Sequence, residues 1–325
     1  MRIFILLIII SILSVNVYAG GITSDPETWQ ITYSTVFKKD GKPVNKYIEK
    51  LLKNLQAEEG EGLLVSLEEF LNHLKRKEAS EVYTKDLVRY ATPKSRHIQK
   101  TQHNNYTKVF LQEKRIKRGV EFLNEYKTLL SDAENIYNVS RKDIVSILMW
   151  ESGLGEFTGK LRVFNIFMGQ ILFLDEAQEY AIEQMKKNGE KYPNENTDTP
   201  QKQKERFEAI RNSAVKGLTA LFRYSKVYNY DPILLKGSWG GAIGYTQFMP
   251  YRFNLAVDGD NDGDVDLFSW PDAIFSVANY LHVYGKYDWD YKKRKRAIRS
   301  YNNSDEYMNG VIAYADTIWQ RYKGF

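Results

Sequence analysis

The sequence predicts a mainly α-helical fold. Large apolar residues recur at helical spacing along much of the chain, and no series of alternating polar and apolar residues indicates a run of strands. Two apolar stripes lie between residues 44 and 90. The first consists of Tyr47, Leu51, Leu52 and Leu55, and the second of Leu63, Leu64, Leu67, Phe70, Leu71 and Leu74.

Further helices are expected over residues 114–130, 207–228, 273–284 and 304–322, again from apolar spacing. Residues 91–108 are polar and predict a linker or a surface crossing. Residues 186–206 are charged and contain Pro193 and Pro200, so we interpret them as an exposed polar insertion. We therefore divide the chain into an N-terminal helical region over residues 20–105 and a core over residues 106–325.

Residues 1–19 have the pattern of a signal peptide. Arg2 gives a positive start, an apolar run extends from Ile3 to Leu13, and Val17-Tyr18-Ala19 offers small residues for cleavage before Gly20. The apolar run is short for a membrane span, although an uncleaved anchor is the alternative. The expected location is therefore the periplasm, reached through a cleaved signal peptide.

The composition supports an exported protein that folds on its own core. The chain has no Cys, so it carries no disulfide and no lipid on an N-terminal Cys, and we expect no stable membrane anchor. Its formal net charge of +5 is mildly basic and suits a polymer that bears carboxylates. No aromatic–basic motif for nucleic acid is present, which excludes nucleic acid as the expected partner.

The stretch from Ser140 to Gly155 predicts a helix that carries a buried carboxyl group. Ser140 and Asp143 resemble a capping box at the start, and Gly153 follows the expected end. Glu151 extends the apolar face on which Ile144 lies. Because burial raises the pKa of a carboxyl group, Glu151 is a candidate general acid for a glycosidic bond. The alternative is a surface Glu at a frayed helix end.

Residues 235–250 form a glycine-rich segment, with four glycines between Gly237 and Gly244. Glycines let a backbone approach a ligand closely, and Tyr245, Gln247 and Phe248 offer the stacking and amide groups of a sugar-binding cleft. The alternative is a tight corner between helices, where glycine permits close packing. The Gly-Lys-Ser/Thr ending of a phosphate loop is absent.

A cluster of aspartates matches the start of an EF-hand calcium loop. Oxygen ligands at positions 1, 3, 5 and 9 and a glycine at position 6 follow that pattern. Position 12 is Ser269 rather than Glu, and the next carboxylate belongs to Asp272. The predicted ligands of one structural Ca²⁺ are Asp258, Asp260, Asp262, Asp266 and Asp272, with Asp264 contributing its carbonyl. The alternative is a solvated acidic turn.

Tyr301-Asn302-Asn303-Ser304 precedes the last helix. Ser304 is a candidate N-cap, and on residues alone this cap is the simplest interpretation. Tyr307, Val311 and Ile318 are expected to face inward. The four His residues have no zinc-type spacing, and we interpret them as structural or surface residues.

Taken in order, these segments resemble the membrane-bound lytic murein transglycosylase B family. The resemblance covers about residues 136–322 and is most specific in the segment Leu235–Pro250. It implies a lysozyme-like catalytic core that cleaves the MurNAc–GlcNAc β-1,4 bond of peptidoglycan, with Glu151 as the acid/base. The positions implied to line the glycan cleft are Ser238, Tyr245, Gln247, Phe248, Tyr301 and Asn302. The resemblance also implies a lengthened EF-hand-like loop with a late carboxylate, at Asp272.

Two departures from the family pattern limit which properties of the family we expect of this chain. Lipid-anchored members have a Cys that this chain lacks, so the membrane-bound part of the family name does not transfer. Some members insert a small β domain before the Tyr-Asn motif, whereas only residues 285–300 fill that space here, so we expect no β domain. The polar stretch after Gln170 also differs from the family.

The expected function is that of a lytic transglycosylase, a glycan lyase that leaves 1,6-anhydroMurNAc ends. The expected cofactor is one structural Ca²⁺, and the expected partners are peptidoglycan glycan strands, with other cell-wall enzymes as candidates. A hydrolytic muramidase is the alternative within enzymes. It would need a second carboxylate about 5 to 9.5 Å from the first, and Glu156 lies past the helix-ending glycines and is expected to be exposed. A non-catalytic peptidoglycan-binding protein is the alternative outside enzymes.

Overall fold

The computed structural model describes residues 29–59, 62–91, 107–189 and 200–323. Helices dominate these residues, which confirms the predicted fold class. The strands are two short antiparallel pairs, β1 with β2 and β3 with β4. Residues 1–28, with the expected signal peptide, lie outside the described residues, as do residues 92–106 and 190–199 of the two polar stretches. Among the described residues, no helix has both the length and the apolar character needed to cross a bilayer.

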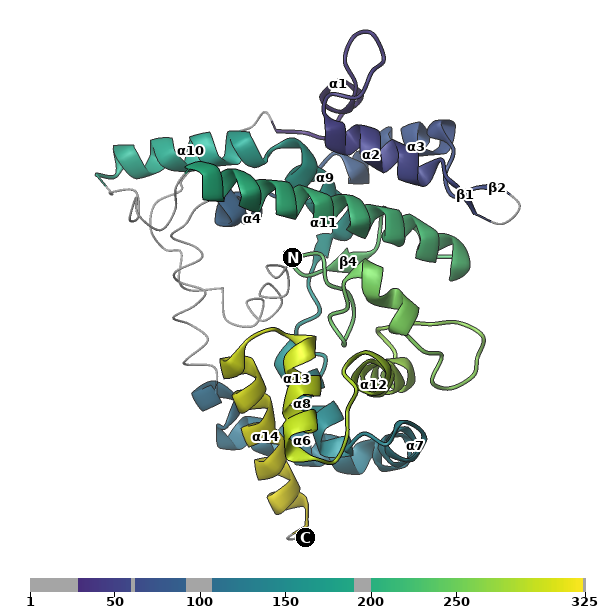
Figure 1. The fold of residues 1–325 in the computed structure, drawn as a ribbon, viewed down its shortest axis with the longest axis vertical. Helices are drawn as coiled ribbons and strands as arrows, with labels where there is room; N and C mark the ends of the chain where they lie inside the picture. Colours follow the sequence, from purple (N-terminus) through teal and green to yellow (C-terminus); the bar gives the residue numbers. More distant parts are fainter. Residues whose placement is uncertain (1–28, 60–61, 92–106, 190–199, 324–325) are drawn as a thin grey trace.

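The elements form an upper and a lower group (Figure 1). The upper group comprises α1 (Tyr33–Val36), α2 (Lys46–Leu55), β1 (Glu58–Glu59), β2 (Gly62–Leu63), α3 (Leu67–Leu74), η2 (Lys77–Ala79), α4 (Thr84–Ala91), α9 (Val163–Leu172), α10 (Leu174–Lys187) and α11 (Pro200–Val227). The lower group comprises α6 (Glu113–Glu125), α7 (Lys127–Tyr137), α8 (Arg141–Ser152), α12 (Trp270–Asn279), the π-helical turn η4 (Tyr280–Tyr284), α13 (Tyr291–Tyr301) and α14 (Asp305–Lys323). Between them lie β3 (Leu161–Arg162), β4 (Lys236–Gly237) and η3 (Pro250–Leu255).

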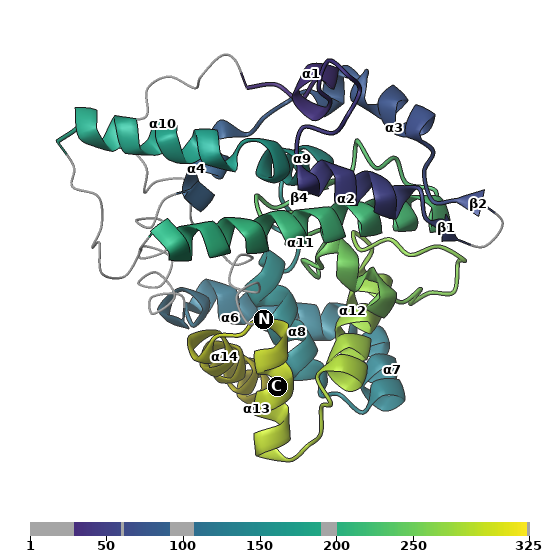
Figure 2. The same ribbon diagram turned by 45° about the horizontal axis from the view of Figure 1, so that its top comes forward.

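The long helix α11 organises the upper group, because α2, α9 and η3 all pack against it (Figure 2). Helix α10 packs on α4 in the same group. Residues 163–189 and 200–227, which the sequence division assigned to the core, therefore lie in the same group as the N-terminal helices. The proposed boundary near residue 106 falls outside the described residues and stays a prediction.

Two helix assignments made from the sequence need correction. Helix α11 begins at Pro200, so residues 200–206 of the expected polar loop are helical, and Lys186 and Lys187 end α10. Proline is favoured in the first turn of a helix, which explains why this proline begins a helix instead of interrupting one. Helix α13 was not predicted, because its sequence is dominated by Lys and Arg and shows only a narrow apolar face.

Helix α8 is the central element of the lower group. Every residue from Asp143 to Ser152 is buried, and α6, α7, α12 and α14 all contact this helix. Close approach of α14 depends on Gly310, where an added Cβ would lie 2.2 Å from the ring of Trp150. The helix ends at Gly153, which adopts the left-handed conformation with φ of 63°, as the sequence predicted.

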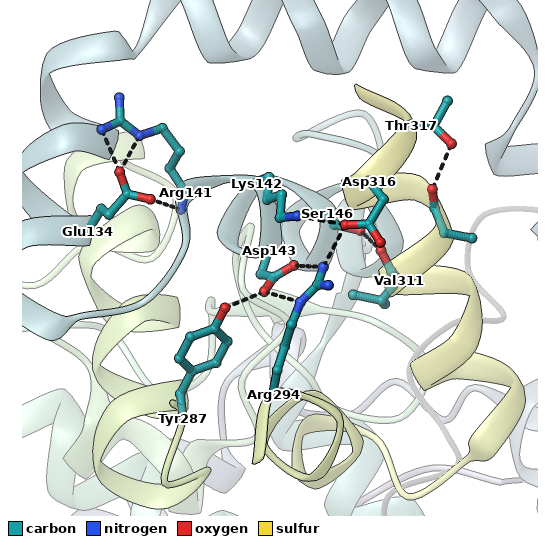
Figure 3. Close-up of polar contacts among 11 residues, drawn as sticks. Glu134, Arg141, Lys142, Asp143, Ser146, Tyr287, Arg294, Val311, Asp316 and Thr317 are labelled. Carbon is teal, nitrogen blue, oxygen red and sulfur yellow. Dashed lines mark hydrogen bonds and ion pairs between the residues drawn. The ribbon is translucent and has the colours of Figure 1, made fainter. Parts of the chain in front are cut away.

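The predicted capping box at the start of α8 is wrong. Ser140 is the N-cap residue but its side chain makes no capping hydrogen bond, and Asp143 points into the protein instead (Figure 3). There Arg294 of α13 donates two hydrogen bonds to the Asp143 carboxylate, with N–O distances of 2.8 and 2.6 Å. Tyr287 donates a third, at 2.6 Å. The side chain of Asp143 therefore bonds a buried residue of another helix and does not cap its own helix.

The buried pair continues into a network that reaches the last helix. Asp316 of α14 accepts hydrogen bonds from Arg294, at 3.1 Å, and from Lys142, at 2.7 Å (Figure 3). Ser146 donates to the carbonyl of Val311 at 2.6 Å. These contacts fix α8, α13 and α14 relative to one another.

Replacement of Arg294 by Leu should destabilise the protein by about 3–5 kcal/mol, because it leaves the Asp143 carboxylate buried without its cation. Arg299→Leu is the matched control, since Arg299 lies on the same helix and pairs with the exposed Asp305. That change should cost less than about 1 kcal/mol. Urea unfolding of both variants measures the difference, and equal losses would contradict a dominant role for the buried pair.

Candidate active site

The carboxyl group of Glu151 is enclosed in the protein at the last turn of α8. Its side chain has no solvent exposure. The hydroxyl of Tyr307, on α14, donates a hydrogen bond of 2.7 Å to Glu151 Oε1, and Oε2 has no hydrogen-bond partner among the described residues. The surface alternative for this residue is therefore excluded, and one oxygen is left for a ligand.

Burial raises the pKa of Glu151 to about 8, and the hydrogen bond from Tyr307 lowers it by a smaller amount. No cation or second carboxylate of the described residues contributes to this shift. The carboxyl group is therefore mainly protonated at neutral pH. A protonated carboxyl group with one oxygen unpartnered has the properties of a general acid.

Three tyrosines surround this carboxyl group. Burial raises the pKa values of Tyr280, Tyr301 and Tyr307, and the charge of Glu151 adds a smaller upward contribution to each. The rings of Tyr280 and Tyr301 lie 4.6 Å apart, and Phe248 lies 5.9 Å from Tyr301. Tyr301 donates a 2.7 Å hydrogen bond to the carbonyl of Thr246, which fixes α13 against the glycine-rich segment.

Two of the predicted cleft residues carry buried amides with atoms that lack partners. Asn302, 1% exposed, has neither its nitrogen nor its oxygen hydrogen-bonded within the described residues. The nitrogen of Gln247 donates to the carbonyls of Gly244 and Thr158, while its oxygen has no such partner. Because buried polar atoms are normally hydrogen-bonded, these three atoms are candidates for contacts with a ligand.

The loop that follows Glu151 borders the remaining predicted residues. Tyr245 stacks on Trp270, with ring centroids 3.9 Å apart, and both rings pack against Gly155. Ser238 is buried, and its hydroxyl accepts a hydrogen bond from the backbone of Ala242. An added Cβ at Gly159 would lie 2.3 Å from the backbone nitrogen of Ser238. The structure thus places Ser238 and Tyr245 beside this loop, and Phe248 and Tyr301 beside Tyr280.

The glycines of the 235–250 segment serve protein packing. A Cβ added at Gly237, Gly241 or Gly244 would come within 2.5 Å of Ala242, Phe167 or Leu267, respectively. At these three positions glycine therefore permits close packing, as the alternative interpretation of the segment expected. Backbone hydrogen bonds in both directions between Ile243 and Phe248 close the turn that presents Tyr245 to Gln247.

The aspartate loop brings three of its six predicted ligands together. Carboxylate oxygens of Asp258, Asp260 and Asp272 lie within 4.8 Å of one another. Backbone hydrogen bonds to Asp258 lower the pKa of its carboxyl group, whereas burial raises that of Asp272. The side chains of Asp262, Asp264 and Asp266 accept hydrogen bonds from the backbone of Asp264, Val265 and Phe268, respectively, and those of Asp258 and Asp272 also accept from backbone N–H groups. A cluster of oxygen ligands is the donor set that Ca²⁺ prefers.

Sequence reasoning missed the role of Tyr307. It was correctly predicted to face inward, but only as a core residue, and its hydroxyl is the hydrogen-bond donor to Glu151. Trp270, the stacking partner of Tyr245, was not singled out either. Glu156 is half-exposed and pairs with Arg115, so the expectation of its exposure is confirmed.

Comparison with known proteins identifies the family. The model of the transglycosylase SLT domain matches residues 66–294, most of the chain. The chain belongs to the transglycosylase SLT domain family. It is 31% identical over 181 residues to membrane-bound lytic murein transglycosylase B of Escherichia coli strain K12, a match that covers 55% of this chain. The chain spans only 41% of the length of that relative.

Solved structures of this SLT-domain family share the fold. The soluble lytic transglycosylase SltB1 of Pseudomonas aeruginosa superposes with a TM-score of 0.52 at 24% identity, over 68% of this chain and 83% of that one. The E. coli lytic transglycosylase SLT35 in complex with calcium gives 0.51 at 18% identity, over 77% and 95% of the two chains. These matches confirm that the protein has a lysozyme-like core.

Glu151→Gln should stabilise the folded protein, and more so as pH rises. The folded pKa of about 8 exceeds the ordinary value, so the unfolded state binds fewer protons between about pH 4.3 and pH 8. Wild-type stability is therefore lost across that window, whereas the amide has no proton to lose. Relative to acid pH, the expected gain near pH 7 is about 3–4 kcal/mol, measured by urea unfolding at several pH values. A gain that does not change with pH would contradict the raised pKa.

Proposed function

We propose that this protein is a peptidoglycan lytic transglycosylase in which Glu151 is the acid/base. The proposal depends on a fully buried carboxyl group that has one oxygen unpartnered and whose pKa is raised by burial to about 8. Family membership and the similarity to a murein transglycosylase support murein as the substrate class. The bond proposed to be cleaved is the MurNAc–GlcNAc β-1,4 bond that the sequence resemblance implies.

The proposed reaction uses the same carboxyl group twice. Glu151 first donates its proton to the glycosidic oxygen as the bond between that oxygen and C1 of MurNAc breaks. The resulting carboxylate then takes the proton of the C6 hydroxyl, whose oxygen forms a new bond to C1. The products are a free hydroxyl on the leaving sugar and a 1,6-anhydroMurNAc end, and Glu151 is protonated again.

The surroundings of Glu151 favour this reaction over hydrolysis. A hydrolytic muramidase uses a second carboxylate to activate water or to form a covalent intermediate. Among the described residues, the hydrogen-bond partner of Glu151 is a tyrosine, and no second carboxylate contributes to its pKa. Glu156 pairs with Arg115 at the surface. Attack by the C6 hydroxyl of the substrate itself needs no second carboxylate.

The proposed glycan contacts come from the residues that border Glu151. The amide atoms of Asn302 and Gln247 that lack protein partners would bond sugar hydroxyl and N-acetyl groups. Tyr245 and its partner Trp270 would offer a stacking surface. Ser238, Phe248 and Tyr301 would shape the cleft around them.

We also propose one structural Ca²⁺ at the aspartate loop. The clustered oxygens of Asp258, Asp260 and Asp272 fit this ion, and a related structure, that of SLT35, contains calcium. Asp262, Asp266 and the carbonyl of Asp264 complete the proposed set. The ion would neutralise the loop and hold it against the start of α12, where Asp272 already binds the backbone of Gly259 and Asp266.

Digestion of purified cell wall should release muropeptides with 1,6-anhydroMurNAc ends, each lighter by one water than a hydrolysed product. Mass spectrometry of the products distinguishes the two. Glu151→Gln should reduce release by about a hundredfold to ten-thousandfold or more, because the amide keeps the shape but cannot deliver a proton. Hydrated ends would assign the protein to the muramidases, and full activity of the variant would exclude Glu151 as the acid.

Saturating Ca²⁺ should raise the melting temperature, and a chelator should lower it. An ion present at about 100 times its dissociation constant adds about 2.7 kcal/mol to folding. Asp260→Asn should remove the response, because this exposed carboxylate belongs to the cluster. Asp264→Asn is the control that should retain it, since only the carbonyl of that residue is proposed as a ligand. A melting temperature indifferent to Ca²⁺ would contradict the site.

The proposed location is the periplasm, after cleavage before Gly20. Cell fractionation with N-terminal sequencing should find the mature protein in the soluble periplasmic fraction. Electrostatic attraction to wall carboxylates would hold part of it to the wall until salt is added. Protein that retains residues 1–19 and stays with the membrane after a high-salt wash would show that the segment is an anchor.

A further inference from the structure

A basic groove lies between α2, α11 and η3, apart from the residues around Glu151. It has a volume of about 630 Å³. Its described lining contains three cations and no acidic residue. The lining consists of Lys50, Asn54, Asn212, Val215, Lys216, Thr219, Ala220, Arg223, Tyr224, Tyr251 and Asn254. A groove with one sign of charge concentrates ligands of the other sign.

Both lysines are held by neutral groups. Lys50 Nζ donates to Asn212 Oδ1 at 3.0 Å, and Lys216 Nζ lies 4.8 Å from the ring centre of Tyr251. An amide oxygen and an aromatic face orient an ammonium group without neutralising it. The charges of these two lysines therefore remain available to an anionic ligand.

The arrangement of the groove fits an extended peptide. Lys216 and Arg223 lie seven residues apart on α11, which separates them by about 10 Å along the helix. Asn54 and Asn254 carry amides, which both donate and accept hydrogen bonds, as the backbone of a peptide requires. A phosphate group, in contrast, would need only hydrogen-bond donors from the protein. The apolar floor formed by Val215 and Ala220 adds contact for small side chains.

We propose that this groove binds the carboxylate-bearing stem peptides of peptidoglycan. The identity of the ligand rests on the proposed function, because peptidoglycan is the polymer that carries such peptides. The groove would retain peptide-bearing wall while the glycan is cleaved at Glu151.

Helix η3, which forms one wall of the groove, also contacts tyrosines near the active site. Tyr251 and Asn254 of η3 line the groove, while Arg252 between them stacks over Tyr284 at 4.0 Å and lies 5.9 Å from Tyr280. Tyr280 belongs to the cluster around Glu151. Helix η3 therefore joins the wall of the groove to Tyr280, which interacts with Glu151.

Calorimetric titration of a sugar-free stem tetrapeptide tests the proposal directly. Wild type should bind it, more weakly as salt rises, and Lys50→Ala/Lys216→Ala should bind at least about tenfold more weakly. The control is Lys53→Ala/Lys204→Ala, which removes the same charge from exposed positions of α2 and α11 outside the groove. This control should match wild type.

Kinetics with two glycans separates the groove from the active site. The groove variant should raise KM for peptide-bearing strands and leave peptide-free strands unaffected. No peptide binding by wild type, equal affinity in all three proteins, or equally tight binding of inorganic phosphate would overturn the proposal. Failure of wild type to cleave either glycan would refute the transglycosylase function instead, and the titration would still report on the groove.

Discussion

The burial of helix α8 on every side is the constraint from which the rest of the lower group follows. A helix enclosed by its neighbours must find a partner for each polar side chain that it carries or keep that side chain uncharged. Helix α8 carries two carboxyl groups inside, at Asp143 and Glu151, eight residues apart, and both are fully buried. The structure treats these two groups in opposite ways.

Asp143 receives a cation and Glu151 does not. Arg294 and Tyr287 give Asp143 three hydrogen bonds, which compensate its charge and join α8 to α13. Glu151 has a single hydrogen bond from Tyr307, so its charged form lacks compensation and its pKa rises to about 8. The ion pair of the first group joins α8 to α13. Burial favours the protonated form of the second, which is the state that a general acid needs.

The sequence predicted the local features of this arrangement and missed the long-range ones. The apolar face that leads to Glu151 and the glycine that ends α8 are local patterns, and both were recognised. The partner of Asp143 could not be recognised, because Arg294 is 151 residues away in a helix whose composition indicates an exposed segment. The Tyr307 hydroxyl was missed for the same reason, since an inward tyrosine on a helix usually signals core packing. The aspartate loop shows the limit differently: spacing suggested six ligands, and the structure brings the carboxylates of three of these residues, Asp258, Asp260 and Asp272, within 4.8 Å of one another.

Infrared difference spectroscopy tests most directly whether Glu151 is a neutral acid at the pH where the protein works. The stretching band of a protonated carboxyl group that is present in wild type and absent in Glu151→Gln belongs to this residue. The structure predicts that this band persists at neutral pH and disappears with a midpoint near pH 8. A band that is lost near about pH 4.3, the ordinary value for Glu, would show that Glu151 is already ionised at neutral pH and would contradict the claim.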